Sequence, residues 1–278
     1  MTAPHDLNAR TDTSSPERLT SEQPLVVTLD RLAASVHQAE VVAQLDGWQV
    51  RYHYGVTRRA NSTWPRSHQG KCGLAQKLQL VEAFYANAGQ APRFQVSPAS
   101  APHGLKEILH DRGYVSDSVT NVQVVDIETV IDRAIPKRFE VWLKPKLEPQ
   151  WLEHDTRFAH SKRANNPAYR TLFENTPQPC VFASLRQDNA VIALGQCVVH
   201  SEEGFAGLFN ISTRPNMRRR GVATALLHHL ARWAQRQGAK QMYLQVEADN
   251  ASANALYTKL GFTTCYQYEH LVKQAELM

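Results

Sequence analysis

The chain has 278 residues, of which 42% are apolar and 21% charged, and its formal net charge is +5. This length suffices for two modest domains, and the absence of any run of about 18 apolar residues excludes a membrane-spanning helix. The arginines are dispersed except at 58–59 and 218–220, and no zinc-finger or aromatic RNA-binding motif accompanies them, so the charge does not indicate a nucleic-acid partner.

The amino-terminal segment is polar and proline-containing. It includes Pro4, Pro16 and Pro24 and lacks the apolar centre of a signal peptide, so we expect residues 1–24 to form a disordered tail. The four cysteines of the chain are far apart, and the twelve histidines show no metal-ligand spacing. The sequence predicts a cytoplasmic protein with no disulfide, no metal ion and no membrane partner.

A strand-like segment followed by a polar, arginine-containing stretch occupies residues 48–65. Trp48, Val50, Tyr52 and Tyr54 alternate as in a strand, and the sequence Thr-Arg-Arg-Ala-Asn-Ser then occupies 57–62. Arginine, asparagine and serine side chains can all bond polar groups. The segment therefore either forms one wall of a ligand site or holds the two halves of the chain together, and both interpretations remain open.

The most informative stretch joins an apolar run to an amphipathic one. Residues 205–211 favour a buried strand, and small or apolar side chains recur at helical spacing from Val222 to Arg236. Between them lies Arg218-Arg219-Arg220-Gly221, followed by Val222, Ala223 and Thr224. Unpaired N–H groups at a helix N-terminus, beside a glycine and several arginines, favour a bound anion. This turn predicts a phosphate site and hence a nucleotide-tailed cofactor.

A second strand and helix follow that turn. Residues 241–247 alternate as in a strand, Asp249 or Asn250 can cap a helix that runs to Lys259, and Gly261 can end it.

These two stretches resemble the GCN5-related N-acetyltransferase (GNAT) superfamily. Its acyl-CoA signature reads Gln/Arg-x-x-Gly-x-Gly/Ala, which Arg218, Gly221 and Ala223 match. A later helix reads Asn-x-x-Ala-x-x-x-Tyr-x-x-x-Gly-Phe, which is matched at every interval by Asn250, Ala253, Tyr257, Gly261 and Phe262. The resemblance covers roughly residues 137–278. It implies that acetyl-CoA is the co-substrate and that an amine, on a small molecule, a protein N-terminus or a lysine, is the acceptor.

The resemblance also implies roles for individual residues. The backbone of Ile211, Ser212 and Thr213 would pair with the pantetheine arm, and amides from Arg218 to Thr224 would hold the pyrophosphate. Tyr257 would be the general acid toward the departing thiolate. Asn250 would either contact the cofactor or cap its helix, and the cap is the simpler role.

No general base can be assigned from the sequence. The strand at 205–211 contains no glutamate, and the nearby candidates are Glu202, Glu203, His200 and Glu247. The missing carboxylate keeps an alternative open, in which the chain is a non-catalytic acyl-CoA-binding sensor or assembly module.

The first half repeats the order of the second. Gly73 precedes Gly113 by the same interval that separates Gly221 from Gly261, which indicates an internal duplication. In the first half, however, Pro102 stands at the Asn250 position and Leu109 at the Tyr257 position. We therefore expect an α/β (mixed α+β) fold of two tandem GNAT-like domains, each a mostly antiparallel sheet flanked by helices. The domains would be a degenerate one at 25–135 and a catalytic one at 136–278.

Overall fold

The computed structural model describes residues 23–68, 70–136, 138–158, 166–177 and 179–273. Residues 1–22 of the predicted amino-terminal tail lie outside these ranges. The last two residues of that predicted tail, 23 and 24, belong to helix α1 (Gln23–Val36). None of the helices in the described ranges is long and apolar enough to cross a membrane.

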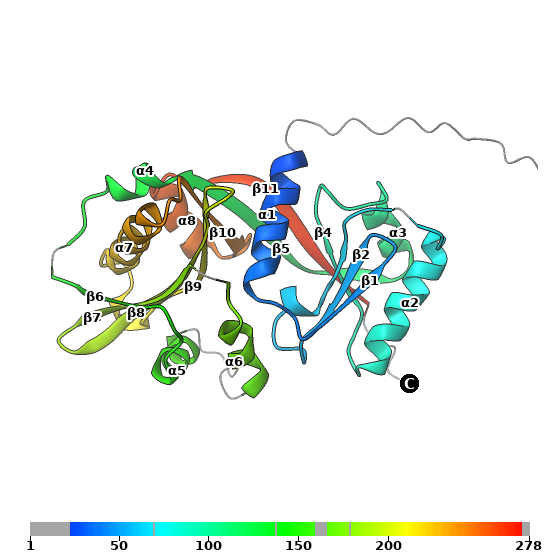
Figure 1. The fold of residues 1–278 in the computed structure, drawn as a ribbon, viewed down its shortest axis with the longest axis horizontal. Coiled ribbons are helices and arrows are strands. Elements are labelled where there is room, and N and C mark those ends of the chain that lie inside the picture. Colours follow the sequence, from blue (N-terminus) through cyan, green and yellow to red (C-terminus); the bar gives the residue numbers. More distant parts are fainter. Residues whose placement is uncertain (1–22, 69, 137, 159–165, 178, 274–278) are drawn as a thin grey trace, which may run out of the picture.

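A single sheet of eleven strands runs through the described chain, in the order β1-β2-β3-β4-β11-β5-β10-β9-β8-β7-β6 (Figure 1). The strands of the first half are β1 (Val41–Leu45), β2 (Trp48–Tyr52), β3 (Thr63–Pro65), β4 (Arg93–Val96) and β5 (Tyr114–Asp126). Those of the second half are β6 (Glu140–Lys144), β7 (Cys180–Gln187), β8 (Ala190–His200), β9 (Phe205–Thr213), β10 (Gln241–Glu247) and β11 (Thr263–Lys273).

Helices cover both faces of this sheet. In the first half they are α1, the short 3-10 helix η1 (Arg59–Asn61), α2 (Leu74–Asn87), α3 (Leu105–Asp111) and α4 (Ile127–Ile131). In the second half they are α5 (Pro149–Phe158), α6 (Pro167–Glu174), η3 (Pro215–Met217), α7 (Val222–Arg236) and α8 (Ala251–Lys259). Mixed sheet and flanking helices agree with the predicted fold class.

The two halves exchange their last strands. β5 lies between β10 and β11, and its Val124 pairs with Tyr243 of β10. The other edge of β11 pairs with β4, where Leu271 is opposite Phe94. In Figure 1 β11 is the red strand that runs from one half of the molecule into the other. Each half is therefore completed by a strand of the other, which local sequence patterns did not indicate.

The internal duplication is visible in the element order. In each half a strand, a helix and a second strand follow one another, and the two strands are parallel: β3 with β4, and β9 with β10. The helices between them are α2 and α7, and the shorter α3 and α8 follow in each half.

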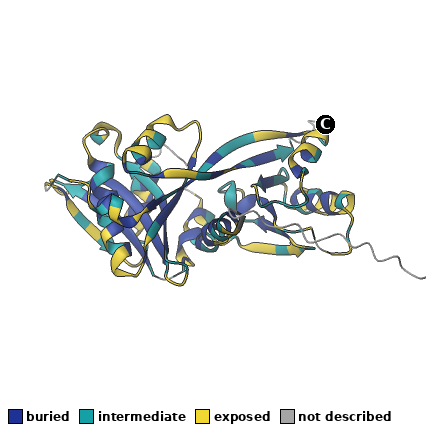
Figure 2. Ribbon diagram, turned by 90° about the horizontal axis from the view of Figure 1, so that it is seen from above, coloured by how far each residue is buried: buried dark blue, intermediate teal, exposed yellow. Residues whose placement is uncertain are grey.

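Three hydrophobic clusters fill the two sides of the sheet, and Figure 2 shows the buried strands between exposed helix surfaces. One cluster packs α7 and α8 against the second half, with Leu226 and Leu230 fully buried. Another packs α2 on the same side of the first half. The third lies on the opposite side, which we call the α1 face, beneath α1, α5 and α6.

Strands β9 and β10 separate partway along their length. They pair from Phe205 and Gln241 only as far as Leu208 and Leu244, although β9 continues to residue 213 and β10 to 247. The register of β9 on β8 shifts at this point, and Asn210 has a φ of 52°. A bulge of this kind bends a strand away from its neighbour. We call this separation the β9–β10 splay.

Candidate active site

The arginine-glycine turn leads into the N-terminus of α7. Gly221 is the N-cap with a φ of 76°, and the first helical bond runs from the Ala225 N–H to the Gly221 carbonyl at 3.0 Å. The amides of Val222, Ala223 and Thr224 therefore have no partner within the helix. Left-handed backbone favours glycine here, and open N–H groups with the positive end of the helix dipole favour an anion.

The three arginines of the turn differ in their surroundings. Arg218 bonds back to the protein, with Nε donating to the Thr213 carbonyl at 3.3 Å and Nη2 to the Phe158 carbonyl at 3.5 Å. Arg219 and Arg220 are exposed. Arg218 therefore fixes the turn to the end of β9, while the other two arginines are exposed next to the N-cap of α7 in sequence.

The end of β9 offers an open backbone edge. Ser212 pairs with Leu194 and Thr213 with Ala193 on β8, but within the described residues no strand pairs with the opposite edge beyond Leu208. Ile211, Ser212 and Thr213 are half-buried there. An extended polar chain could add to this edge as an extra strand would.

Tyr257 lies on α8 and is 7% exposed. Its ring packs edge-on against Phe262 at 5.6 Å, and burial raises the pKa of the phenol to about 12, so the group is protonated at neutral pH. Asn250 caps the same helix, since its side-chain oxygen accepts from the Ala253 N–H at 3.1 Å.

A buried polar network flanks the splay on the α1 face. The Asn210 amide donates to the Tyr169 hydroxyl at 2.8 Å and to the Asp155 carboxylate at 3.2 Å, and Tyr169 donates to Asp155 at 3.0 Å. These bonds join β9 to α5 and α6. They hold both helices against the strand at the point where it leaves β10.

No position of β9 carries a carboxylate. At Gly207 an added Cβ atom would lie 2.6 Å from both the Tyr243 hydroxyl and the Phe209 ring, so a side chain there would require these rings to move. Glu203 is in the β8–β9 turn, at the end of β9 away from the splay, and binds Arg31 at 2.5 Å. Exposed Glu202 shares that turn, and His200 contacts Tyr243 at 3.2 Å. Of the four base candidates, Glu247 is the one on the splayed end of β10.

The segment at 57–62 forms a rigid turn. The side-chain oxygen Oδ1 of Asn61 accepts from the backbone N–H groups of His53 at 2.7 Å and Gly55 at 3.0 Å. The Asn61 amide donates to the carbonyls of His53 at 3.2 Å and Thr57 at 2.7 Å. Asn61 is 2% exposed, and the neighbouring Ala60 is fully buried in the cluster of the α1 face.

This turn presents two arginines to the second half of the chain. Arg58 binds Glu247 on β10 at 2.7 Å and Asp117 at 2.8 Å, and Arg59 donates to the Gln245 side chain. Gln245 and Glu247 lie beyond Leu244, at the splay. The segment therefore holds the two halves together, which is one of the two interpretations that the sequence left open.

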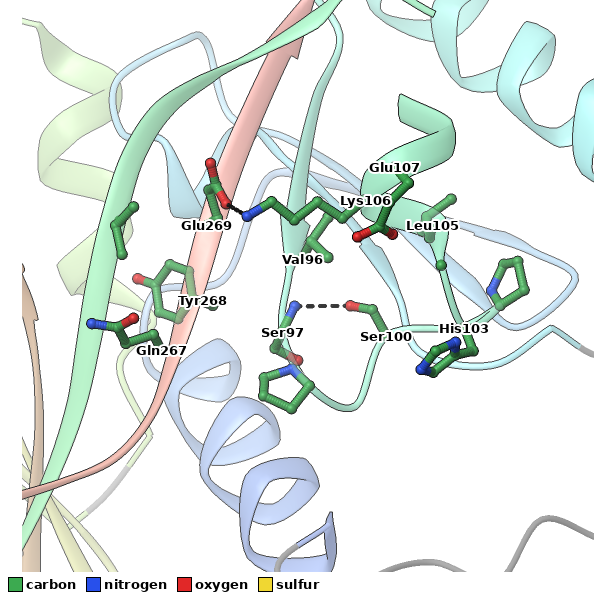
Figure 3. Close-up of a pocket in the computed structure, with 14 residues that line it drawn as sticks. Val96, Ser97, Ser100, His103, Leu105, Lys106, Glu107, Gln267, Tyr268 and Glu269 are labelled. Atoms are coloured by element: carbon green, nitrogen blue, oxygen red, sulfur yellow. Dashed lines mark hydrogen bonds and ion pairs between the residues drawn. The ribbon is translucent and has the colours of Figure 1, made fainter. Parts of the chain in front are cut away.

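The first half differs at the equivalent positions. Gly73 before α2 is extended, with a φ of −63°, and Leu109 is fully buried. A cavity of about 410 Å³ lies there between β4, α3 and β11, crossed by the Lys106–Glu269 ion pair (Figure 3). This cavity contains none of the motif residues of the second half.

Comparisons with known proteins match this architecture. A family described as "Probable histone acetyltransferase Rv0428c C-terminal" matches residues 26–271. "Uncharacterized N-acetyltransferase YobR" of Bacillus subtilis is 27% identical over 247 residues, covering 88% of this chain and 98% of the relative.

Solved structures share the fold at low identity. A GCN5-related N-acetyltransferase from Kribbella flavida has a TM-score of 0.65 at 14% identity, covering 92% of this chain and 96% of that one. A tandem GNAT protein from the clavulanic acid biosynthesis pathway has a TM-score of 0.58 at 13% identity, covering 75% and 73%. The tandem GNAT fold predicted from the motifs is confirmed.

Proposed function

Since the chain belongs to the Rv0428c-type acetyltransferase family of the GNAT superfamily and is an N-acetyltransferase, we propose that it transfers an acetyl group from acetyl-CoA to a primary amine by direct attack on the thioester. The observation that carries this proposal is the β9–β10 splay, with an open strand edge that leads into the N-terminus of α7.

The proposed cofactor contacts use this open edge and the N-terminus of α7. The pantetheine arm would bond to the open edge at Ile211–Thr213, and the pyrophosphate would accept from the amides of Val222, Ala223 and Thr224. Gly221 leaves the backbone accessible, because an added Cβ would meet only the Pro136 ring, at 3.6 Å. Arg219 and Arg220 would add charge near the phosphates. Acetyl-CoA supplies the activated acetyl group.

Tyr257 is proposed as the general acid. Its phenol is protonated at neutral pH, as a proton donor must be. Burial disfavours every anion, so it raises the pKa of a thiol leaving beside Tyr257 as it raises that of the phenol. Burial that raises both pKa values does not by itself widen the difference between them, and the phenol can protonate or hydrogen-bond the thiolate.

The functional division of the chain is proposed near residue 135. The second half would hold the cofactor, and the first half would supply the wall of the acceptor site through 57–62 and complete the sheet with β5. The acceptor would be a small-molecule amine, a protein N-terminus or a lysine. The acetyltransferase relatives favour an enzyme over the non-catalytic acyl-CoA sensor.

Calorimetric titration of acetyl-CoA into the full chain tests the cofactor site. Gly221→Asp places a negative charge and a strained side chain at the turn, and we expect it to weaken binding at least about 100-fold, because two or more charge-assisted bonds are lost. Gly238→Asp is the matched control, since Gly238 also has a positive φ of 92° and open space around it. Binding by Gly221→Asp equal to that of the control would refute the site.

Tyr257→Phe tests the chemistry separately. The variant should bind acetyl-CoA within about twofold of the native chain, while kcat for release of free thiol with an amine acceptor falls about 100-fold. An unchanged kcat would remove Tyr257 from the mechanism.

A further inference from the structure

Arg59 is a cation without a counterion at the splay. It is half-buried, and its Nη1 donates to the neutral side chain of Gln245. Among the described residues no carboxylate lies within ion-pair distance of Arg59, whereas the adjacent Arg58 binds both Asp117 and Glu247. Of these two neighbouring arginines, therefore, only Arg58 has its charge neutralised by described residues.

The groups around Arg59 do not cancel its charge. Burial, and then the Arg59 charge, lower the pKa of His37 to about 4, and the same two causes lower the pKa of His270 well below its usual value. Both imidazoles are therefore neutral at pH 7. Asp155, on the β9 side of the splay, is held by Tyr169 and Asn210 rather than by Arg59.

The turn fixes Arg59 before any ligand arrives. The Asn61 side chain makes four hydrogen bonds to the backbone of residues 53–57. The Ser62 hydroxyl donates to the Arg59 carbonyl at 3.3 Å, and Ala60 is fully buried. A guanidinium carries five N–H donors, so Arg59 keeps most of its donors for a ligand. A cation whose backbone is fixed and whose charge has no counterion is typical of a binding site, because part of the ordering cost is met in folding rather than in binding.

We infer that the acceptor amine also carries a carboxylate and that Arg59 binds this carboxylate at the splay. The inference rests on the proposed function, because it places the amine at the thioester of acetyl-CoA. A planar guanidinium pairs with a carboxylate through two parallel N–H bonds, and one uncompensated arginine matches one such charge. Amino acids and short peptides with a free carboxyl terminus are the corresponding substrate class.

Matched pairs of acceptors test this inference on the full chain loaded with coenzyme A. The probes are alanine with alaninamide, glutamate with isoglutamine, and glycylglycine with its carboxamide, measured by calorimetry and, with acetyl-CoA, by thiol release. At least one carboxylate should bind 10- to 100-fold more tightly than its amide, an estimate of about one charge-assisted pair. In Arg59→Gln this ratio should fall to about one. Arg58→Gln should keep it.

Three results would overturn the inference. One is that no carboxylate of the panel is preferred to its amide, including the case in which neither binds. Another is that the preference survives in Arg59→Gln. The last is that Arg59→Gln lowers kcat equally for carboxylates and amides with KM unchanged, which would assign Arg59 to the thioester carbonyl instead. Acetyl-CoA titration separates these results from a failure of the proposed function, which would abolish cofactor binding as well.

Discussion

Replacing Asn61 with alanine removes the side chain that holds the 57–62 turn. The native amide makes four hydrogen bonds of 2.7 to 3.2 Å and is 2% exposed, so water cannot readily replace it. At a net value of about 1 kcal/mol for each bond, with some relaxation of the turn, we expect the free energy of unfolding to fall by about 3 kcal/mol. In a chain of this size that corresponds to a melting temperature lower by about 6 to 12 °C.

Urea unfolding of the native chain and of Asn61→Ala measures this loss. Asn87→Ala is the control, because Asn87 is exposed at the end of α2, and it should change stability by less than about 0.5 kcal/mol. Acetyl-CoA affinity should stay unchanged in both variants, while Asn61→Ala loses acceptor affinity along with the placement of Arg59. A loss of stability below about 1 kcal/mol would refute the claim that the turn is held by these bonds.

Two further predictions concern the shared sheet and the buried histidines. A fragment of residues 136–278 lacks β5 and leaves β10 and β11 without their common neighbour, so circular dichroism should show no cooperative thermal unfolding. A fragment that begins at Tyr114 keeps β5 and should unfold cooperatively. Equal unfolding curves for the two fragments would refute the strand exchange. His37 has a pKa of about 4 in the folded chain, below its unfolded value, so the unfolded chain binds more protons between pH 6.5 and 4 and the free energy of unfolding should fall as the pH drops through this window. In His37→Gln the urea midpoint should fall less steeply over the same pH range. A fall as steep as that of the native chain would contradict the prediction.

Local sequence patterns predicted the elements around the arginine-glycine turn, from β9 to α8, but not most of the strands and helices that precede them in the second half. Apolar spacing placed a helix at Val222–Arg236 and a strand at Gln241–Glu247, and both elements have those bounds in the structure. These signals are local, because side-chain periodicity is set by the geometry of one helix or strand. The same logic gave the internal repeat, since each copy carries its own glycines at the same interval.

The pairing of strands could not be predicted in this way. The expected domains at 25–135 and 136–278 would each contain a sheet of its own, yet β5 and β11 each lie beside a strand of the other half. A strand pattern shows which face is buried but not which edge is paired. For the same reason, the role of Arg58 and Arg59 stayed open until β10 was seen beside their turn.

The sequence alone identified the superfamily, and it predicted a phosphate-binding turn and the candidate acid Tyr257, because these depend on residue types at fixed local intervals. Three properties became visible only in the folded structure: β9 and β10 separate, Gly207 lies tightly against Tyr243, and Arg59 has no counterion among the described residues. Those properties depend on contacts between segments as far apart as residues 59 and 245, and only the folded chain brings such segments together.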